Sequence, residues 1–361
     1  MLTRISVDNY KCLVDFDLRL GREHLFLGPN GSGKSTVFEV LSALHRLQRA
    51  EARVDELFPS STRTRWQKRP TQVFELEALL EGSRYRYRLE LSHDNEAGRG
   101  ELHEEYLFVG DIPLYTATSH RLGTVHLDNG VRSNFLTDPS RSGLGSLRGL
   151  AEAQRITRFV RWVDSLCVVR LEPRQMTGRS DKEHTEPAEN LANFASWYRH
   201  LAQERLNEAV VLRDTLRGVL QGFDALVLKS GGEGIRLLRS LWRRGSGSEG
   251  PSAVDEYAFE ELSDGQRVLV GLYTLLHFLA GTGTTLCLDE PDTFLTAAEF
   301  QPVLRALRAQ QGLQVLLTSH HPEALRMLAP EAGLSFERVA GGPVRVTPVQ
   351  LAVATGVPAA G

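Results

Sequence analysis

Cysteine and long apolar runs are both scarce in this chain. The three cysteines, Cys12, Cys167 and Cys287, lie far apart, so neither a zinc-ligand spacing nor a disulfide framework is visible. The longest apolar run, residues 268–280, contains polar side chains and is too short to cross a bilayer. No charged segment followed by an apolar core, as in a signal peptide, comes after Met1. We therefore expect a cytoplasmic protein with no membrane contact.

A strong excess of one charge is also missing. The 361 residues carry a formal net charge of -3, which argues against a wholly basic nucleic-acid binder but leaves room for a local basic patch. Hydrophobic residues at 41% and charged residues at 24% are typical of a globular protein. The length predicts one elaborated domain or two lobes.

Alternating strand and helix patterns occur at both ends of the chain. A buried strand over 25–27 precedes a Gly-rich loop, and apolar residues then recur at helical spacing from Val37 to Leu47. The elements expected near the other end are helices over 264–280, 297–310 and 322–329, strands over 284–289 and 313–318, and a hairpin turning at 341–342. This order predicts an α/β fold.

The middle of the chain is less regular. The elements expected there are a hairpin over 73–91, strands near 104–109, 124–127 and 167–171, helices within 150–165 and 188–222, and a flexible connector over 244–252. We therefore expect an N-terminal α/β lobe with a β subdomain (1–135), a helical insertion (136–250) and a C-terminal lobe (251–361).

A phosphate-binding loop is the first motif that carries chemistry. Residues 28–35, GPNGSGKS, match G-x-x-x-x-G-K-[ST] between a strand and a helix. The glycines let backbone N–H groups surround phosphate oxygens, and the helix N-terminus adds partial positive charge. Lys34 is expected to contact the β- and γ-phosphates of ATP, and Ser35 to ligate Mg²⁺. The nucleotide-binding residues expected here are Asn30, Gly31, Ser32, Gly33, Lys34, Ser35 and Thr36.

Two acids follow a second apolar strand. Asp289 is expected to hold magnesium, and Glu290 to polarise the water that attacks the γ-phosphate. Acids after an apolar strand are often only solvated turn residues. The phosphate-binding loop in the same chain favours the catalytic interpretation.

The subclass depends on residues 262–266, LSDGQ, at the start of a predicted helix. This stretch resembles the signature sequence of the ABC ATPase superfamily. The resemblance implies that Ser263, Gly265 and Gln266 meet the γ-phosphate of ATP bound to a second protomer. A serine N-cap and free N–H groups form an anion site, although an isolated motif of this kind would be an ordinary helix cap.

Further positions of that superfamily have candidates here. Thr318-Ser319-His320 resembles the switch-histidine position, which implies that His320 contacts the γ-phosphate or the attacking water. The adjacent His321 leaves this assignment open by one residue, and a surface histidine pair is the alternative. Gln175 is the candidate for the Q-loop glutamine at the metal; otherwise it is a polar loop residue. Residues 291–297 occupy the D-loop position without the histidine-containing stretch usual there.

The chain is most similar to RecF, SMC and OLD-like heads within that superfamily. The resemblance rests on 5–11 (ISVDNYK), 27–31 (LGPNG), the hairpin with Tyr85 and Tyr87, 189–191 (ENL) and 262–266. It implies a P-loop NTPase fold of the ABC ATPase head type, with a mixed core sheet, an antiparallel β subdomain and a helical signature lobe. It also implies a homodimer enclosing two ATP molecules, and DNA as a partner in repair, genome maintenance or anti-phage defence.

Two absences refine this resemblance. The insertion lacks sustained heptads, so a long SMC-type coiled coil is not expected. The residues after Pro330 are too few for the nuclease domain that OLD proteins append. We expect a stand-alone ATPase head, with any cutting done by a separate nuclease or toxin partner.

Basic residues cluster in two places that DNA could contact. The first cluster comprises Arg46, Arg49, Arg53, Arg63, Arg65, Lys68 and Arg69, followed by three arginines on one face of the strand 84–88. The alternative is a solvated polar face with Tyr85 and Tyr87 in the core. The second, 236–244, is expected to border a packed element. Either double- or single-stranded DNA would be bound without sequence preference.

Three function classes therefore remain open. The chain is a DNA-associated ATPase clamp, a regulatory ATPase that controls a toxin or nuclease partner without binding DNA, or the motor of a membrane transporter. The first agrees best with the resemblance.

Overall fold

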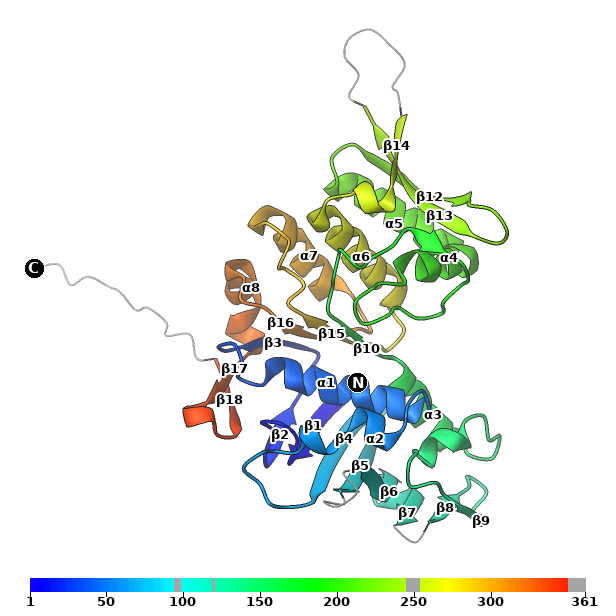
Figure 1. Ribbon diagram of the computed structural model, residues 1–361, viewed down its shortest axis with the longest axis vertical. Helices are drawn as coiled ribbons and strands as arrows, with labels where there is room; N and C mark the ends of the chain where they lie inside the picture. The colour runs from blue at the N-terminus through cyan, green and yellow to red at the C-terminus, as the bar shows by residue number, and fades with distance from the viewer. Residues whose placement is uncertain (94–98, 119–120, 245–253, 350–361) are drawn as a thin grey trace, which may run out of the picture.

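A central sheet separates two lobes in the computed structural model, which describes residues 1–93, 99–118, 121–244 and 254–349 (Figure 1). Helix α1 and a large antiparallel sheet lie on one side, and the helices α4 to α7 lie on the other. All of the predicted connector at 244–252 except Arg244 lies outside the described residues. No helix in the described ranges is long and apolar enough to cross a membrane.

The central sheet is mixed, with five parallel strands. Its order is β10 (Leu166–Val169), β15 (Thr285–Asp289), β16 (Gln314–Thr318), β3 (Glu23–Leu27), β17 (Gly333–Arg338) and β18 (Val344–Pro348). Only β18 runs antiparallel, paired with β17 through the predicted hairpin. Every residue of β15 and β16 is buried, as expected of strands covered on both faces.

Alternate side chains of these strands enter two separate cores. Phe26 and Cys287 pack on the side of α1 (Lys34–Gln48), whereas Leu25 and Leu288 pack on the opposite side. The helices that cover that opposite side are α6 (Asp264–Leu279), α7 (Ala297–Ala309) and α8 (Pro322–Ala332). The C-terminal α/β pattern predicted from the sequence is therefore confirmed.

The antiparallel sheet forms most of the N-terminal lobe. Its order is β2 (Phe16–Arg19), β1 (Leu2–Asp8), β4 (Thr71–Leu80), β5 (Ser83–His93), β6 (Gly100–Val109), β7 (Ile112–Thr118), β8 (Leu122–His126) and β9 (Arg132–Leu136). Tyr85 and Tyr87 on β5 are buried against Phe159 of α3 (Gln154–Asp164), with ring centres 6.0 and 5.6 Å away. The predicted alternation along β5 is confirmed.

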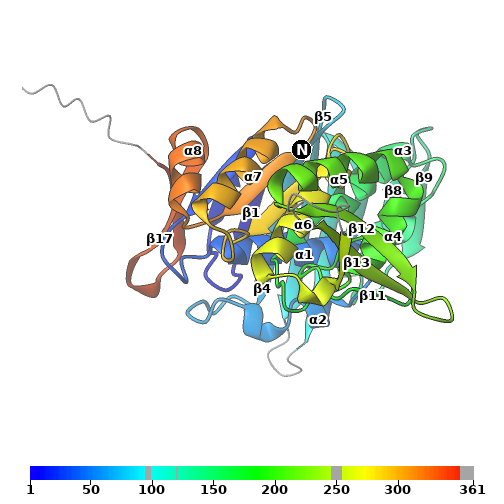
Figure 2. The same cartoon turned by 90° about the horizontal axis from the view of Figure 1, so that it is seen from above.

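The helical lobe also contains a small sheet. Helices α4 (Phe194–Glu204) and α5 (Leu206–Val219) accompany β12 (Phe223–Ser230) and β13 (Arg236–Arg243), on the opposite side of the molecule from α8 (Figure 2). Strand β13 pairs with β12, and also with β11 (Arg179–Ser180) and β14 (Val254–Ala258).

The segment predicted as a helical insertion, 136–250, is not a separate helical unit. Its helix α3 packs into the core of the antiparallel sheet, and its strand β10 joins the central sheet. Strands β11, β12 and β13 lie in the same segment. Residues on both faces of β12 are half-buried, so the strand lacks the alternation of buried and exposed positions that would have indicated it.

Candidate nucleotide site at the carboxyl edge of the central sheet

The loop between β3 and α1 has the backbone shape of a phosphate-binding loop. Gly28 and Gly33 have φ of 140° and 99°, and α1 begins at the next residue, Lys34. A Cβ atom at Gly28 would lie 2.2 Å from the carbonyl oxygen of Phe336, and one at Gly33 would lie 2.6 Å from a methyl of Val344. Side chains are therefore excluded at both positions, and the backbone stays open for a ligand.

Polar groups in this loop have few partners. The Lys34 ammonium donates to the carbonyl oxygens of Gly28 and Pro29 at 2.7 and 3.1 Å. Burial lowers the pKa of Lys34, against the opposing effect of Glu290 and Asp289. The buried hydroxyl of Ser32 has no hydrogen-bond partner among the described residues. A buried unpaired hydroxyl costs free energy. A phosphate oxygen in the loop would accept hydrogen bonds from the Ser32 hydroxyl and from the Lys34 ammonium.

Asp289 links the loop to the strands beside it. Its Oδ1 accepts from the Ser35 hydroxyl at 3.1 Å and from the Thr318 hydroxyl at 2.6 Å. Thr318 lies opposite Asp289 in the register of β16 and β15. Ser35 and Asp289, two of the three residues predicted at the magnesium, therefore lie together at this edge of the sheet.

Thr318 is a site residue that the sequence reasoning missed. Its hydroxyl also accepts from the backbone N–H of Glu290 at 2.9 Å, while its carbonyl accepts from the same N–H at 3.2 Å. The signal was its position as the last residue of a fully buried strand next to that of Asp289, since carboxyl ends of parallel strands share one edge.

Glu290 has an unusual backbone conformation. Its φ is 48°, in the left-handed region that costs a non-glycine residue about 1–3 kcal/mol. The two bonds from its N–H to Thr318 hold it there. The side chain is half-buried and influences the pKa of Lys34, which places its charge near the loop.

The signature segment begins α6 in the predicted way. Ser263 is the N-cap residue. Its hydroxyl accepts from the N–H of Gln266 at 3.2 Å, and the side-chain oxygen of Gln266 accepts from the N–H of Ser263 at 2.9 Å. A Cβ at Gly265 would lie 2.9 Å from the carbonyl oxygen of Phe294 in the predicted D-loop. No hydrogen bond within the described ranges joins Ser263 to the phosphate-binding loop.

His320 and His321 differ in their surroundings. The ring of His321 accepts from the N–H of Glu323 at 3.1 Å and caps α8, and it packs on Phe300 with ring centres 5.3 Å apart. His320 is exposed. The capping role of His321 favours His320 as the switch histidine, and that role stays a prediction.

Gln175 is not in contact with Ser35 or Asp289. Its amide nitrogen donates to Glu172, and its oxygen accepts from Asn190 at 2.6 Å. The neighbouring Arg174 lies 3.3 Å from Asp264 at the start of α6. The proposed metal role of Gln175 stays a prediction that no described contact supports.

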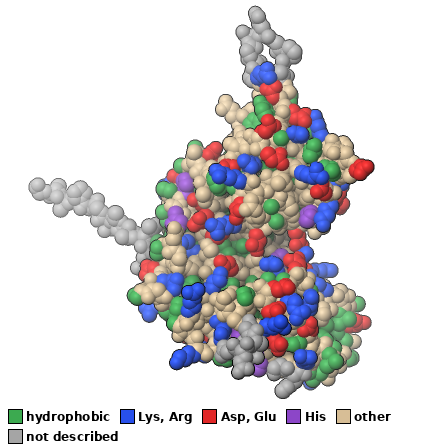
Figure 3. Space-filling view, viewed as in Figure 1, with side chains coloured by type: hydrophobic (Ala, Val, Ile, Leu, Met, Phe, Trp, Pro, Cys, Tyr) green, Lys and Arg blue, Asp and Glu red, His purple; other side chains and the backbone are tan. Residues whose placement is uncertain are grey.

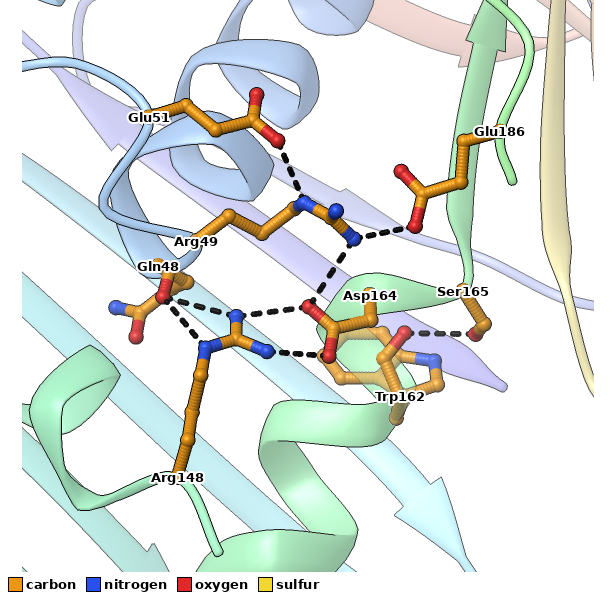
Figure 4. Close-up of polar contacts among 8 residues, drawn as sticks. All are labelled: Gln48, Arg49, Glu51, Arg148, Trp162, Asp164, Ser165 and Glu186. Atoms are coloured by element: carbon orange, nitrogen blue, oxygen red, sulfur yellow. Dashed lines mark hydrogen bonds and ion pairs between the residues drawn. The ribbon is translucent and has the colours of Figure 1, made fainter. Parts of the chain in front are cut away.

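Most arginines of the predicted basic segments are ion-paired. Arg49 bonds Glu51 and Glu186, linking α1 to the other lobe beside the pair Arg148–Asp164 (Figure 4). The other paired cations are Arg53, Arg69 and Arg88 in the first cluster and its strand, and Arg239, Arg243 and Arg244 in the second. Figure 3 shows charges of both signs mixed over the visible face.

Four cations of the first cluster form no ion pair within the described part of the chain. Arg46, Arg65 and Lys68 are exposed, and Arg63 is half-buried. Strand β13 carries the second basic stretch, which confirms that it borders a packed element. Three of its arginines, Arg239, Arg243 and Arg244, pair with acids of the strands β12 and β14.

A large cleft between the lobes is separate from this site. Its volume is about 970 Å³, and it is lined by residues of α1, β10, α4 and the segment 184–190, including Ser42, Cys167 and Glu186. None of residues 28–36 lines it. Its walls carry acids, arginines and histidines together.

Comparison with known proteins indicates the family. The family model described as "AAA domain, putative AbiEii toxin, Type IV TA system" matches residues 24–143 and 179–326, which include the phosphate-binding loop, Asp289, Ser263 and His320. A stretch of 41 residues is 46% identical to the OLD nuclease of Thermus scotoductus. The match covers 11% of this chain and 8% of that relative, so the chain spans a small part of its length.

Solved structures with the same fold are heads of SMC proteins. The SMC head bound to the C-terminal winged-helix domain of ScpA has a TM-score of 0.59 at 11% identity, covering 97% of this chain and 98% of that one. The head from Thermotoga maritima gives 0.50 at 14% identity, covering 97% and 99%. The Pyrococcus furiosus head bound to a ScpA domain gives 0.52 at 11%, covering 96% of each. The predicted ABC-type head fold is confirmed.

Proposed function

We propose that this chain, which belongs to the AAA domain family matched above and is an ATPase of the AAA/SMC-like type, hydrolyses ATP with magnesium as a head-to-tail dimer. The observation that carries the proposal is the convergence of Lys34, Ser35, Asp289 and Glu290 at one edge of the central sheet. These residues come from two distant parts of the sequence.

The oxygen donors at this edge fit a magnesium ion. The Ser35 hydroxyl and the Asp289 carboxylate lie 3.1 Å apart, and hydroxyl and carboxylate oxygens are ligands that Mg²⁺ prefers. No group of three His, Cys, Asp or Glu side chains suited to a metal occurs in the described ranges, so phosphate oxygens and water would complete the shell. A bound ion there would neutralise charge on the phosphates.

The chain's own groups then have separate tasks. The loop N–H groups and Lys34 bind the phosphates, and Lys34 exchanges its bonds to Gly28 and Pro29 for phosphate oxygens. Glu290 orients a water and accepts its proton, a role for which its carboxylate must stay free. Thr318 fixes both Asp289 and Glu290, so it is a positioning residue.

The exposed position of Ser263, away from the phosphate-binding loop of its own chain, supports the dimer. The N-terminus of α6 is an anion site that faces solvent and does not bond the phosphate-binding loop of its own chain. The neighbouring Phe294 has 40% of its surface exposed, which is high for a phenylalanine. A second protomer that places its ATP against Ser263 would cover both.

We further propose that the ATPase cycle opens and closes a clamp on DNA, in repair, genome maintenance or anti-phage defence. The free cations Arg65 and Lys68 and the local similarity to an OLD nuclease support this proposal. A second candidate function is control of a toxin or nuclease partner without DNA contact. The toxin–antitoxin description of the matched family favours that candidate.

The test is ATP turnover by the purified protein with and without DNA, at low and moderate salt. Stimulation by DNA that declines as salt rises would support the clamp, because phosphate contacts depend on counterion release. Turnover that is indifferent to DNA would leave the ATPase and favour the protein partner. Absence of turnover in every condition would contradict the proposed enzyme activity.

A further inference from the structure

Trp66 is an exposed tryptophan beside the phosphate-binding loop. Its exposed fraction is 49%, whereas Trp162 and Trp197 are almost wholly buried. The guanidinium carbon of Arg338 lies 5.8 Å from the centre of its ring. A large aromatic side chain that is half exposed next to a ligand loop is an available stacking surface.

Arg338 connects this ring to the loop itself. Its guanidinium donates to the carbonyl oxygen of Gly31 at 3.1 Å, and to those of Gly341 and Gly342 in the β17–β18 turn. It has no carboxylate partner in the described ranges. The side chain is therefore held by backbone carbonyls alone, and its charge stays uncompensated beside the phosphate-binding residues.

The segment that carries Trp66 is fixed against the end of β1. The N–H of Lys11 donates to the carbonyl of Thr62 at 2.6 Å, and Tyr10 forms a β-bridge with Arg63. Trp66 lies three residues further along the chain. These backbone contacts tie the start of the segment that carries Trp66 to residues 10–11, next to Cys12.

A third contact closes the same side of the loop. The space that a Cβ at Gly33 would fill is bounded by Val344 at 2.6 Å and by the sulfur of Cys12 at 3.1 Å. The same sulfur lies 3.8 Å from the hydroxyl of Thr36. Three segments far apart in the sequence therefore build one wall next to residues 31–36, with apolar, aromatic and cationic parts.

We propose that Trp66 and Arg338 form the subsite for the nucleobase of the bound nucleoside triphosphate. The base stacks on the open face of the Trp66 ring. Arg338 packs on the opposite face of the same ring and keeps its hydrogen bond to the carbonyl oxygen of Gly31. A purine is preferred because its larger ring system covers more of the indole. This inference rests on the proposed ATP site and adds the part that binds the base.

The experiment compares a non-hydrolysable ATP analogue with inorganic tripolyphosphate, both measured by calorimetry with magnesium on the full chain. The variants are Trp66→Ala and the conservative Trp66→Phe, with Trp242→Phe in the other lobe as the control. Trp66→Ala is expected to weaken the analogue roughly 5- to 150-fold, the equivalent of about 1–3 kcal/mol for one stacked base. Tripolyphosphate should bind all variants equally, and Trp66→Phe should keep most of the affinity for the analogue.

Two results would overturn the subsite. One is equal affinity of wild type and Trp66→Ala for the ATP analogue, which would leave Trp66 for a DNA base or a protein partner. The other is an equal loss for analogue and tripolyphosphate, which would make Trp66 a support of the phosphate loop. Failure of the wild-type chain to bind either ligand would instead contradict the proposed ATP site.

Discussion

The two large sheets of this protein differ in how completely the chain's own groups bond their buried polar side chains. In the central sheet, Asp289 and Thr318 stand at the carboxyl ends of fully buried strands, beside a loop with an unpaired hydroxyl. In the antiparallel sheet, Glu105 is wholly buried within the lobe. The first arrangement stays open for a ligand, and the second is closed by the chain itself.

The bonds of Glu105 illustrate the closed arrangement. Its carboxylate accepts from the hydroxyls of Tyr87 and Ser142 at 2.9 and 2.6 Å, from the Gln48 amide at 3.0 Å and from the N–H of Gly143 at 3.0 Å. Burial and the nearby charge of Glu105 raise the pKa of Tyr87 well above its ordinary value. This network fixes the end of α1, whereas the central sheet presents the start of α1 to a substrate.

The largest effect on activity is expected from Glu290→Gln. Turnover of ATP should fall about 10²- to 10⁴-fold, as for loss of a general base. The free energy of unfolding should change by less than about 0.5 kcal/mol, because the half-buried side chain forms no hydrogen bond or ion pair within the described ranges. Steady-state phosphate release and chemical denaturation measure the two quantities. A variant that hydrolyses ATP at the wild-type rate would remove Glu290 from the catalytic site.

The contrasting substitution is Glu105→Ala in the antiparallel sheet. It leaves the Tyr87 hydroxyl and the N–H of Gly143 without their acceptor, so we expect a loss of about 3 kcal/mol in the free energy of unfolding. Affinity for ATP in the folded protein should stay within about threefold. Glu101→Ala, exposed on the same strand, is the matched control. Equal stability of the two variants would show that the network does not stabilise the lobe.

A smaller effect on activity is expected from Thr318→Val. The change removes the hydroxyl that donates to Asp289 and accepts from the N–H of Glu290. The lost hydrogen bonds contribute about 1–3 kcal/mol of free energy to holding the two acids in place. Turnover should fall roughly 5- to 100-fold, and the magnesium concentration for half-maximal rate should rise. Thr318→Ser keeps the hydroxyl and should restore both values. If Val and Ser variants behave alike, Thr318 does not position the acids.

The smallest effect concerns charge on the surface. DNA affinity falls as salt rises, and the magnitude of this slope on a log–log plot reflects the number of phosphate contacts. The double variant Arg65→Glu, Lys68→Glu should reduce that magnitude by about 2, if each cation contacts one phosphate. Filter binding at several salt concentrations measures this slope. Arg305→Glu, an exposed arginine of α7 outside both basic clusters, is the control, and its slope should be closer to that of wild type. An unchanged slope in the double variant would exclude this segment as the DNA contact.

The same comparison explains what the sequence could predict. The strands β15 and β16 and the loop 28–35 have strong local patterns, so their type and approximate bounds were predicted correctly. Strands β7 and β9 were missed because neither alternates regularly between buried and exposed positions. In β7 two consecutive residues are buried, and β9 is almost wholly exposed.

Contacts between residues that are far apart in the sequence could not be predicted from local patterns. Thr318 joins the candidate site through Asp289, and Trp66 joins the proposed base subsite through Arg338, a partner far away in sequence. The motif at 318–320 pointed to His320 and not to Thr318, and no local motif marks Trp66. The pairing of most arginines in the basic segments was likewise set by tertiary structure. Arg88, for example, bonds Glu75 on the neighbouring strand.

The composite site is tested by the molar mass of the Glu290→Gln variant in solution, with and without ATP and magnesium. We expect a monomer without nucleotide and a dimer at saturating ATP and magnesium, because hydrolysis no longer reopens the paired sites. Ser263→Arg in the same background should prevent the dimer while preserving ATP binding. A Glu290→Gln chain that binds ATP and stays monomeric would contradict the composite site.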